Sequence, residues 1–284
     1  MRKVLKMALG CICAASMMAF VGCGGEEGAY TTKETLNGKT TEEKYDEIMA
    51  TIDGQSENFS SLVQYDIHCT ANVQSMTIDM DLQMTSTVKM SGNDFYAFDF
   101  VDAGEFMGMD MGSMSSKVWY VGGTAYLESA ATGEMVGSVP NATMKCTVTM
   151  EKLCQMAGLE EGQLFNPIYD FSDTAFEDVK FNVGESDSYF EIVMKGDEAS
   201  AYAQKLLEKQ GMAGSFNIPQ VNYKFMMDKE GNFDYVKVDF DVTASINGGS
   251  YKYNYDGKIT FSDIGTTTVA APEGGENWTT VTPA

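Results

Sequence analysis

Residues 63–73, VQYDIHCTANV, alternate between apolar and polar side chains along their whole length. Residues 78–90 and 236–246 repeat the same alternation. Successive side chains of an extended strand point to opposite faces, so each segment presents one apolar and one polar face. Strands with one solvated face are typical of antiparallel sheets. These three segments therefore predict long antiparallel strands.

Shorter runs of the same kind extend the predicted sheet. They are residues 94–101, 117–121, 124–128, 179–183, 189–194, 221–227 and 251–261. Glycine-containing turns, which suit hairpins, separate neighbouring runs at residues 122–123, 229–232 and 247–249. The sequence thus predicts an α+β fold that is mostly β.

Helical spacing is seen in three short segments. Residues 40–52 begin with a capping box, Thr-Thr-Glu-Glu, followed by an apolar stripe. A second helix is expected from Met150 to Ala157, with Thr149 as its N-cap. A third is expected over residues 197–211, ending at a glycine.

The predicted strands carry more apolar surface than these helices can cover. Fourteen strand residues extend about 45 Å, whereas fourteen helical residues cover about 20 Å. The sheet must curl over itself, bind a partner, or leave a groove for an apolar ligand. Inward-facing methionines favour a groove, because flexible thioethers adapt to varied guests, although they also occur as ordinary core. We expect the groove to be lined by Ile67, Met80, Leu82, Met84, Val238 and Phe240.

The N-terminus has the organisation of a bacterial lipoprotein signal peptide. Three basic residues precede an uncharged apolar run, residues 7–21, which is shorter than the roughly twenty residues that span a bilayer. The run ends in Phe-Val-Gly-Cys at residues 20–23, which is similar to a lipobox, with Phe20 where that motif usually has Leu. We expect acylation of Cys23 and anchoring on the outer face of the bacterial cytoplasmic membrane. An ordinary cleaved signal is the alternative.

Charge argues against a nucleic-acid partner. The chain has 19 Lys and Arg against 41 Asp and Glu, and cleavage before Cys23 would remove three basic residues and no acidic one. Arg2 is its single arginine, although arginine is the usual residue for bidentate phosphate recognition. Many secreted domains are acidic for solubility alone, so the charge identifies no partner.

The chain divides into four segments. Residues 1–22 are the signal peptide, and residues 23–39 are expected to be the lipidated cysteine and a flexible, Gly- and Thr-rich tether. Residues 40–273 are long enough to form a single domain with its own core. Residues 274–284 form a C-terminal tail.

The lipobox, the long alternating strands and the final segment ending in Val269-Ala-Ala-Pro272 together resemble the LolA-like group of bacterial lipoproteins. That group includes the mycobacterial LppX and LprG proteins and Gram-positive lipoproteins with a similar Val-x-x-Pro tail. The resemblance implies a half-barrel, a large curved antiparallel sheet with a few short helices covering its concave face. It also implies carriage of a lipid or another apolar molecule.

Catalysis has little support in the sequence. His68, the single histidine, falls on the polar face of a strand and is expected to be a surface residue. Pairs of carboxylates arise by chance in so acidic a chain, and there is no Gly-rich phosphate loop. We expect a protein that is not an enzyme and needs no cofactor.

Sulfur-containing residues raise two further questions. Cys69, Cys146 and Cys154 would remain beside the acylated cysteine, and their spacing leaves open whether two of them pair or all are free thiols. Four methionines, Met107, Met109, Met111 and Met114, are weak candidates for Cu(I) ligands. A mobile hairpin at the rim of the groove is the alternative for that segment.

Residues 228–234, DKEGNFD, superficially resemble a calcium loop. They lack the later glutamate ligand and lie between two predicted strands, so a hairpin turn explains them better.

The sequence therefore leaves two possible functions. The first is a membrane-anchored lipoprotein that binds or carries a lipid or other apolar ligand in a sheet groove. The second is a structural or interaction lipoprotein of the cell surface whose core is filled by its own side chains.

Overall fold

A computed structural model describes residues 30–53, 58–73, 76–102, 104–106, 109–133, 141–157, 176–197, 200–201, 204, 214–246 and 249–282. Cys23 lies outside these residues, as does most of the third expected helix. Within the described residues, no helix is long and apolar enough to cross a membrane.

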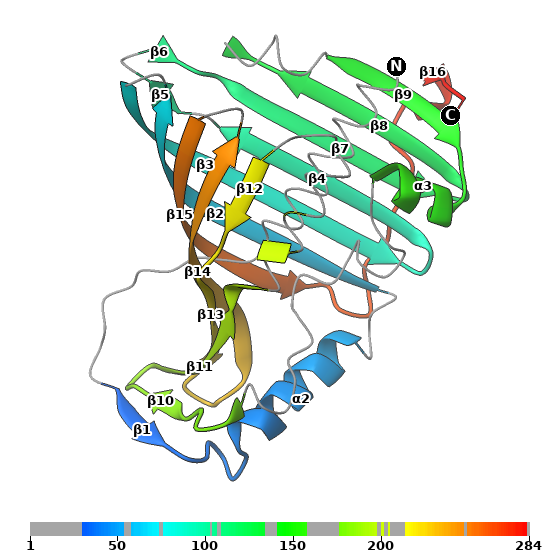
Figure 1. Ribbon diagram of the computed structural model, residues 1–284. Helices are drawn as coiled ribbons and strands as arrows, with labels where there is room; N and C mark the ends of the chain where they lie inside the picture. Colours follow the sequence, from blue (N-terminus) through cyan, green and yellow to red (C-terminus); the bar gives the residue numbers. More distant parts are fainter. Residues whose placement is uncertain are drawn as a thin grey trace.

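The fold is mostly β, as the sequence predicts (Figure 1). Among the described residues, its bounded helical segments are α2 (Thr41–Asp53), α3 (Met150–Ala157) and the 3-10 turn η3 (Gly275–Asn277). Residues 196–197, 200–201 and 204, at the start of the third expected helix, are also helical. The strands are β1 (Thr31–Lys33), β2 (Asn58–Val73), β3 (Met76–Ser91), β4 (Asp94–Asp102), β5 (Glu105–Phe106), β6 (Met109–Asp110), β7 (Ser113–Val121), β8 (Thr124–Ala131), β9 (Ala142–Thr147), β10 (Phe181–Val183), β11 (Asp187–Lys195), β12 (Gly214–Asn217), β13 (Gln220–Asp228), β14 (Phe233–Ile246), β15 (Gly249–Ser262) and β16 (Thr279–Thr280).

One open, curved sheet of 14 strands contains most of these elements. Its order is β1-β10-β11-β13-β14-β15-β2-β3-β4-β7-β8-β9-β16, with β12 added to β14. Neighbouring strands pair antiparallel except β16, which runs parallel to β9. Strands β5 and β6 form a separate small hairpin. The expected large antiparallel sheet is confirmed.

The alternating segments form the middle of the sheet. Strand β2 pairs with β3 along its whole length, from Asn58 opposite Ser91 to Val73 opposite Met76, and pairs on its other side with β15. The turn at Gly122 and Gly123 has positive φ at both residues, 56° and 79°, which a two-residue hairpin of the favoured twist requires.

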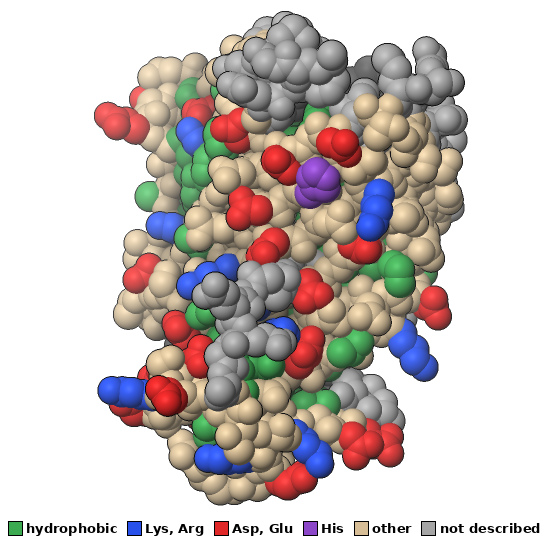
Figure 2. Space-filling model, turned by 90° about the vertical axis from the view of Figure 1, so that its left-hand side faces the viewer, with side chains coloured by type: hydrophobic (Ala, Val, Ile, Leu, Met, Phe, Trp, Pro, Cys, Tyr) green, Lys and Arg blue, Asp and Glu red, His purple; other side chains and the backbone are tan. Residues whose placement is uncertain are grey.

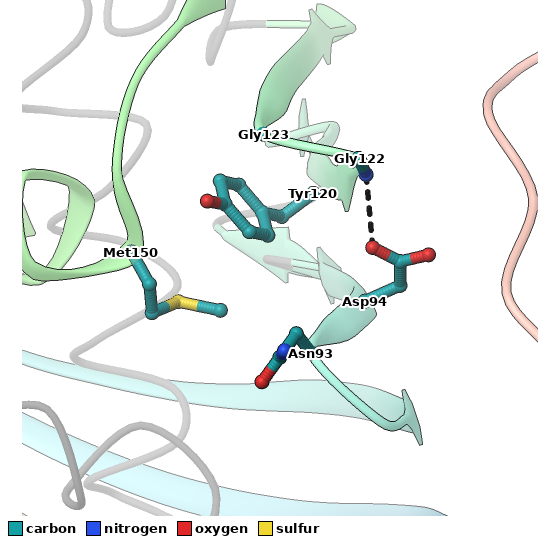
Figure 3. A pocket seen from close by; sticks show the side chains of 6 residues that line it. All are labelled: Asn93, Asp94, Tyr120, Gly122, Gly123 and Met150. Carbon is teal, nitrogen blue, oxygen red and sulfur yellow. Dashed lines mark hydrogen bonds between the residues drawn. The ribbon is translucent and has the colours of Figure 1, made fainter.

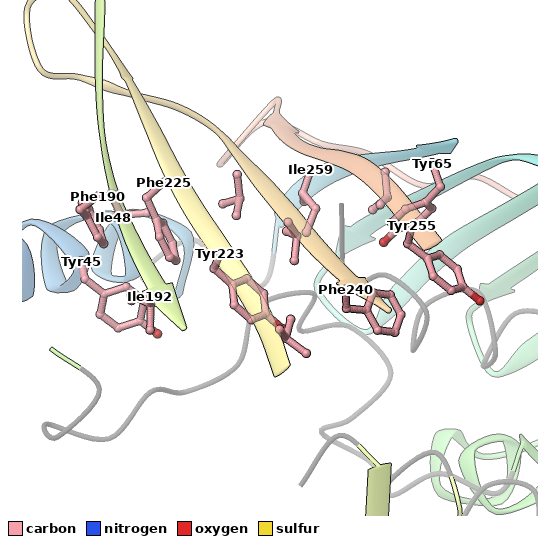
Figure 4. Packing of buried hydrophobic residues seen from close by; sticks show 14 of the residues in the cluster. Tyr45, Ile48, Tyr65, Phe190, Ile192, Tyr223, Phe225, Phe240, Tyr255 and Ile259 are labelled. Carbon is pink, nitrogen blue, oxygen red and sulfur yellow. The ribbon is translucent and has the colours of Figure 1, made fainter. Parts of the chain in front are cut away.

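Apolar side chains gather on one face, called here the inner face, which carries Val63 on β2, Ala97 on β4 and Val118 on β7. Two clusters cover it. The first lies around β2, β11, β13, β14 and β15, and includes Tyr45 and Ile48 of α2 (Figure 4). The second lies around β3, β4, β7, β8 and β9, and includes Leu153 of α3. The two helices therefore pack on the same face of the sheet, over different parts of it.

Both helices begin at the caps expected from the sequence. In α2, the Thr40 hydroxyl accepts the Glu43 backbone N–H at 3.2 Å, and the Glu43 carboxylate accepts the Thr40 N–H at 2.8 Å. This reciprocal pair is a complete capping box. In α3, the Thr149 hydroxyl accepts the Lys152 N–H at 3.2 Å.

Both ends of the described chain form strands of the sheet, whereas a flexible tether was expected at the N-terminal end. Strand β1 pairs with β10, and the Tyr30 hydroxyl donates to the Asp187 carboxylate at 3.0 Å. The tether predicted for residues 23–39 is thus corrected from Tyr30 onward. Strand β1 is exposed and polar, so it lacks the apolar alternation by which the longer strands were found.

The C-terminal segment docks on the outer face, the one opposite the inner face. The Trp278 ring meets Trp119 and Tyr126 edge-on, with centroids 5.8 and 6.0 Å apart. Strand β16 then pairs with β9 at the end of the sheet (Figure 1). Two residues are too short a strand to show a period, so the sequence did not predict it.

The capping box gives a first prediction. Thr40→Ala should lower the free energy of unfolding by about 1 kcal/mol, because it removes the acceptor for the Glu43 N–H. Urea denaturation measures this loss. The matched control is Thr51→Ala, which removes an exposed hydroxyl bonded only to the carbonyl one turn earlier in the same helix. An equal loss in both variants would contradict the capping role.

Candidate functional site

The six residues predicted to line the groove form one patch on the inner face. They lie on β2, β3 and β14, and the strand registers place them in three neighbouring rows. In the central row, Phe240 lies opposite Tyr255, Tyr255 opposite Ile67, and Ile67 opposite Leu82. The Phe240 and Tyr255 rings stack with centroids 4.4 Å apart.

The patch is packed as part of the first core cluster. Ile67, Met84, Val238 and Phe240 are buried, and Leu82 packs against them. Met80 and Leu82 are half-buried. The structure thus brings the predicted lining residues together. Their role in holding a ligand stays a prediction.

A row of buried polar side chains crosses the inner face between the two clusters. The registers place Ser86 of β3 opposite Asp99 of β4, Asp99 opposite Ser116 of β7, and Ser116 opposite Ser129 of β8. All four are buried. We call these four residues the polar row. On β2, the residue opposite Ser86 is Val63, which belongs to the first cluster. The inner-face residues next to Asp99 on β4 and next to Ser116 on β7 are Ala97 and Val118, which belong to the second cluster.

Asp99 is the exceptional member of the polar row. Its side chain is 4% exposed, and Ser86 is its hydrogen-bond partner. Its Oδ2 atom has no hydrogen-bond partner, and neither has the Ser116 hydroxyl, which is also 4% exposed. Burial raises the pKa of Asp99 from 3.8 to about 8, and the hydrogen bond from Ser86 opposes this only in part. The uncharged, protonated form of Asp99 therefore predominates at neutral pH.

Each unpartnered buried polar group destabilises a fold by about 1–3 kcal/mol. Such groups are rare in folded proteins, and a functional role is one recognised explanation for them. A ligand group that bonds to Asp99 and Ser116 would remove this penalty.

Sequence reasoning missed the polar row. Residues 94–101, DFYAFDFV, place apolar side chains on both faces of the strand, so the pattern does not show which face Asp99 takes. The signal that was available is the lone acidic residue inside an aromatic run.

A pocket of about 640 Å³ opens at one end of the second cluster (Figure 3). Its lining comes from two hairpin turns, Asn93 beside β4 and Gly122–Gly123 after β7, and from Met150 at the start of α3. The Tyr120 ring points toward the Met150 side chain, and the Asp94 carboxylate accepts the Gly122 N–H at 2.9 Å. Because Tyr120 also belongs to the second cluster, the pocket adjoins the apolar inner face.

The structure gives no support to catalysis by His68. Its ring is on the surface of the long strands among acidic side chains, with Nδ1 2.8 Å from the Asp81 carboxylate (Figure 2). Among the described residues, no group of three or more His, Cys, Asp or Glu side chains could hold a metal ion.

Two of the three remaining cysteines are placed. Cys69 and Cys146 are buried free thiols, and burial raises the pKa of both. They are therefore small core residues of low reactivity. The side chain of Cys154 lies outside the described set.

The methionine cluster is described only in part. Met111 lies after β6, where its N–H bonds to the Gly104 carbonyl at 2.9 Å, and Met114 lies in β7. Met107 and the side chain of Met109 lie outside the described set. The expected hairpin is present as β5 and β6, and copper binding stays untested.

The calcium-like segment is a hairpin turn, as expected. The Asp228 carboxylate accepts the N–H groups of Glu230 and Asn232 at 2.9 and 2.8 Å. The hydrogen bond from the Asn232 side chain, together with these backbone bonds, lowers the pKa of Asp228.

Comparison with family profiles and with curated protein sequences finds no match. Several solved structures are similar at low scores. A DUF1329 family protein from Desulfovibrio piger has a TM-score of 0.26 and 8% identity, covering 78% of this chain and 94% of its own. A protein from Vibrio parahaemolyticus named as an outer membrane lipoprotein-sorting protein domain has a TM-score of 0.24 and 10% identity, covering 83% and 95%. The ywiB protein of Bacillus subtilis has a TM-score of 0.19 and 8% identity, covering 73% and 96%. At these TM-scores the likenesses carry no argument about fold or function.

The buried carboxyl gives a pH prediction. Between about pH 4 and pH 8 the unfolded chain has lost the Asp99 proton while the folded chain keeps it, so stability falls as pH rises, by up to about 1.4 kcal/mol per pH unit. Asp99→Asn has no such titration. Its stability relative to the natural protein should therefore increase with pH across this window and level off above it.

Thermal unfolding measured at several pH values checks this expectation. Ser116→Ala is the control, since it removes a neighbouring buried hydroxyl but no ionisable group and should shift stability similarly at every pH. A difference between Asp99→Asn and the natural protein that stays constant from pH 4 to pH 8 would contradict the raised pKa.

Proposed function

We propose that this protein is a lipid-anchored extracytoplasmic protein that binds or carries a lipid or another amphiphile on the inner face of its sheet. The observation that carries the proposal is the combination of two apolar clusters and the polar row between them. An amphiphile has the same combination of a polar group and long apolar chains, so it can bury its chains and bond its polar group at once.

The methionines support a ligand of variable shape. Met84 and Met90 are buried on the inner face, and Met80 and Met194 are half-buried. Unbranched thioether side chains repack around different guests more readily than branched ones. This suits a carrier that accepts chains of different length.

A structural role with a self-filled core is the second candidate. The tight burial of Ile67, Met84, Val238 and Phe240 favours it, because these side chains already pack against one another. The two functions differ in one measurable property, which is whether the purified protein carries an apolar molecule.

Native mass spectrometry of residues 24–284, which include every described residue, tests the proposal. After purification from bacterial cells we expect a stoichiometric adduct that solvent extraction removes and lipid analysis identifies. Met144→Trp, at a half-buried inner-face position on β9 beside the second cluster, should reduce the bound fraction at least several-fold by filling the site. Thr143→Trp, at the preceding residue on the outer face, is the matched control and should bind normally.

A clean apo mass, with no uptake of added lipids, would overturn the carrier function and leave the self-filled module. Equal binding by the natural protein and Met144→Trp would overturn the placement of the ligand beside the second cluster.

The anchor is proposed from residues 20–23 and needs its own test. Cys23→Ala should move the protein from the detergent phase to the aqueous phase in Triton X-114 partitioning, because the variant has no thiol to acylate. The matched control is Cys13→Ala, within the apolar run of the signal peptide, which should stay in the detergent phase. A variant at position 23 that still partitions into detergent would contradict acylation at Cys23.

A further inference from the structure

We infer that the polar row binds the head group of the amphiphile, and that this head group is uncharged and bears hydroxyl or carbonyl groups, as in an acylglycerol. The inference rests on the proposed function and deepens it by naming the ligand class. It starts from the two atoms of the polar row that have no hydrogen-bond partner, Asp99 Oδ2 and Ser116 Oγ, which lie on adjacent strands of the inner face.

The two groups make a matched pair for such a ligand. Protonated Asp99 accepts at one oxygen and donates from the other, and a serine hydroxyl both donates and accepts. Ser86 already bonds to Asp99, so a ligand hydroxyl or carbonyl would extend an existing chain of hydrogen bonds. Directly opposite residues of neighbouring antiparallel strands lie about 5 Å apart, which is the scale of a glycerol group.

Charge on the described inner face argues against ionic head groups. Lys89 and Lys117 are the basic residues of β3 and β7, and alternation places both on the outer face, where Lys117 pairs with Glu128. The buried Lys44 belongs to α2, which packs over the first cluster, and it pairs with Glu47. A phosphate or carboxylate at the polar row would therefore be a buried, unpaired anion. An ammonium group would need ionised Asp99, and the apolar surroundings oppose that ionisation.

The place for the apolar chain follows from β7. From Ser116, the next inner-face positions are Val118 and Tyr120, and Tyr120 lines the pocket beside α3. Four strand residues span about 13 Å. A chain that starts at the polar row can thus run along the second cluster toward the pocket.

Three probes with the same eighteen-carbon chain test the head group. Monooleoylglycerol, oleic acid and oleylamine are titrated into residues 24–284 at pH 7, and the dissociation constants are measured by competition with a fluorescent fatty-acyl probe. We expect monooleoylglycerol to bind at least about 10-fold more tightly than either charged probe, because the site offers uncharged hydrogen-bonding groups only.

Variants connect this preference to the polar row. Ser116→Ala and Asp99→Leu should each weaken monooleoylglycerol binding about 5- to 10-fold while leaving the two charged probes nearly unchanged. Asp99→Asn, which keeps a donor and an acceptor, should retain most of the affinity. If Asp99→Leu does not fold, Ser116→Ala tests the loss of affinity. The control is Ser188→Ala, at a buried serine of β11 outside the polar row.

The outcomes separate this inference from the proposed function. Equal affinity for all three probes, tighter binding of a charged probe, or an unchanged preference in Ser116→Ala and Asp99→Leu would overturn the head-group assignment alone. Failure of every probe to bind would overturn the proposed function together with it.

Discussion

The structure depends on covering one apolar face of a very wide sheet. Strands of 14–16 residues, such as β2, β3, β14 and β15, present far more apolar surface than α2 and α3 can hide. Burial of apolar area is the main favourable contribution to folding, so this face must be covered by packing or by a ligand. The two core clusters are the packing solution, each closed in part by one helix.

The polar row interrupts this apolar face, whereas a core optimised for stability alone would have apolar side chains at these four positions. A carboxyl group and three hydroxyls replace the aliphatic residues that occupy the neighbouring rows, and two of their atoms have no partner. Local rules of folding are broken most often at functional sites, where the loss in stability accompanies a gain in binding. In the proposed function, the same face that holds the fold together would also recognise the amphiphile.

The sequence predicted the elements that depend on the period of apolar residues or on local capping residues. Alternation located the long strands, and Thr40, Glu43 and Thr149 marked the helix starts that the hydrogen bonds confirm. It did not predict β1, β9, β12 or β16, which are short and carry no clear period. The polar row was out of reach for a different reason. Ser86, Asp99, Ser116 and Ser129 meet only through the register of four strands, and register is set by turns and packing along the whole sheet.

Photo-crosslinking tests the central claim, that an amphiphile binds on the inner face, most directly. A monoacylglycerol with a diazirine in its acyl chain is bound to the protein, irradiated, and the modified peptides are identified by mass spectrometry. The account predicts labelling of inner-face positions in the second cluster, such as Val118, Tyr120 and Leu153, and protection by unlabelled lipid. Labelling confined to outer-face residues such as Trp119 and Tyr126, or labelling that unlabelled lipid does not reduce, would contradict it.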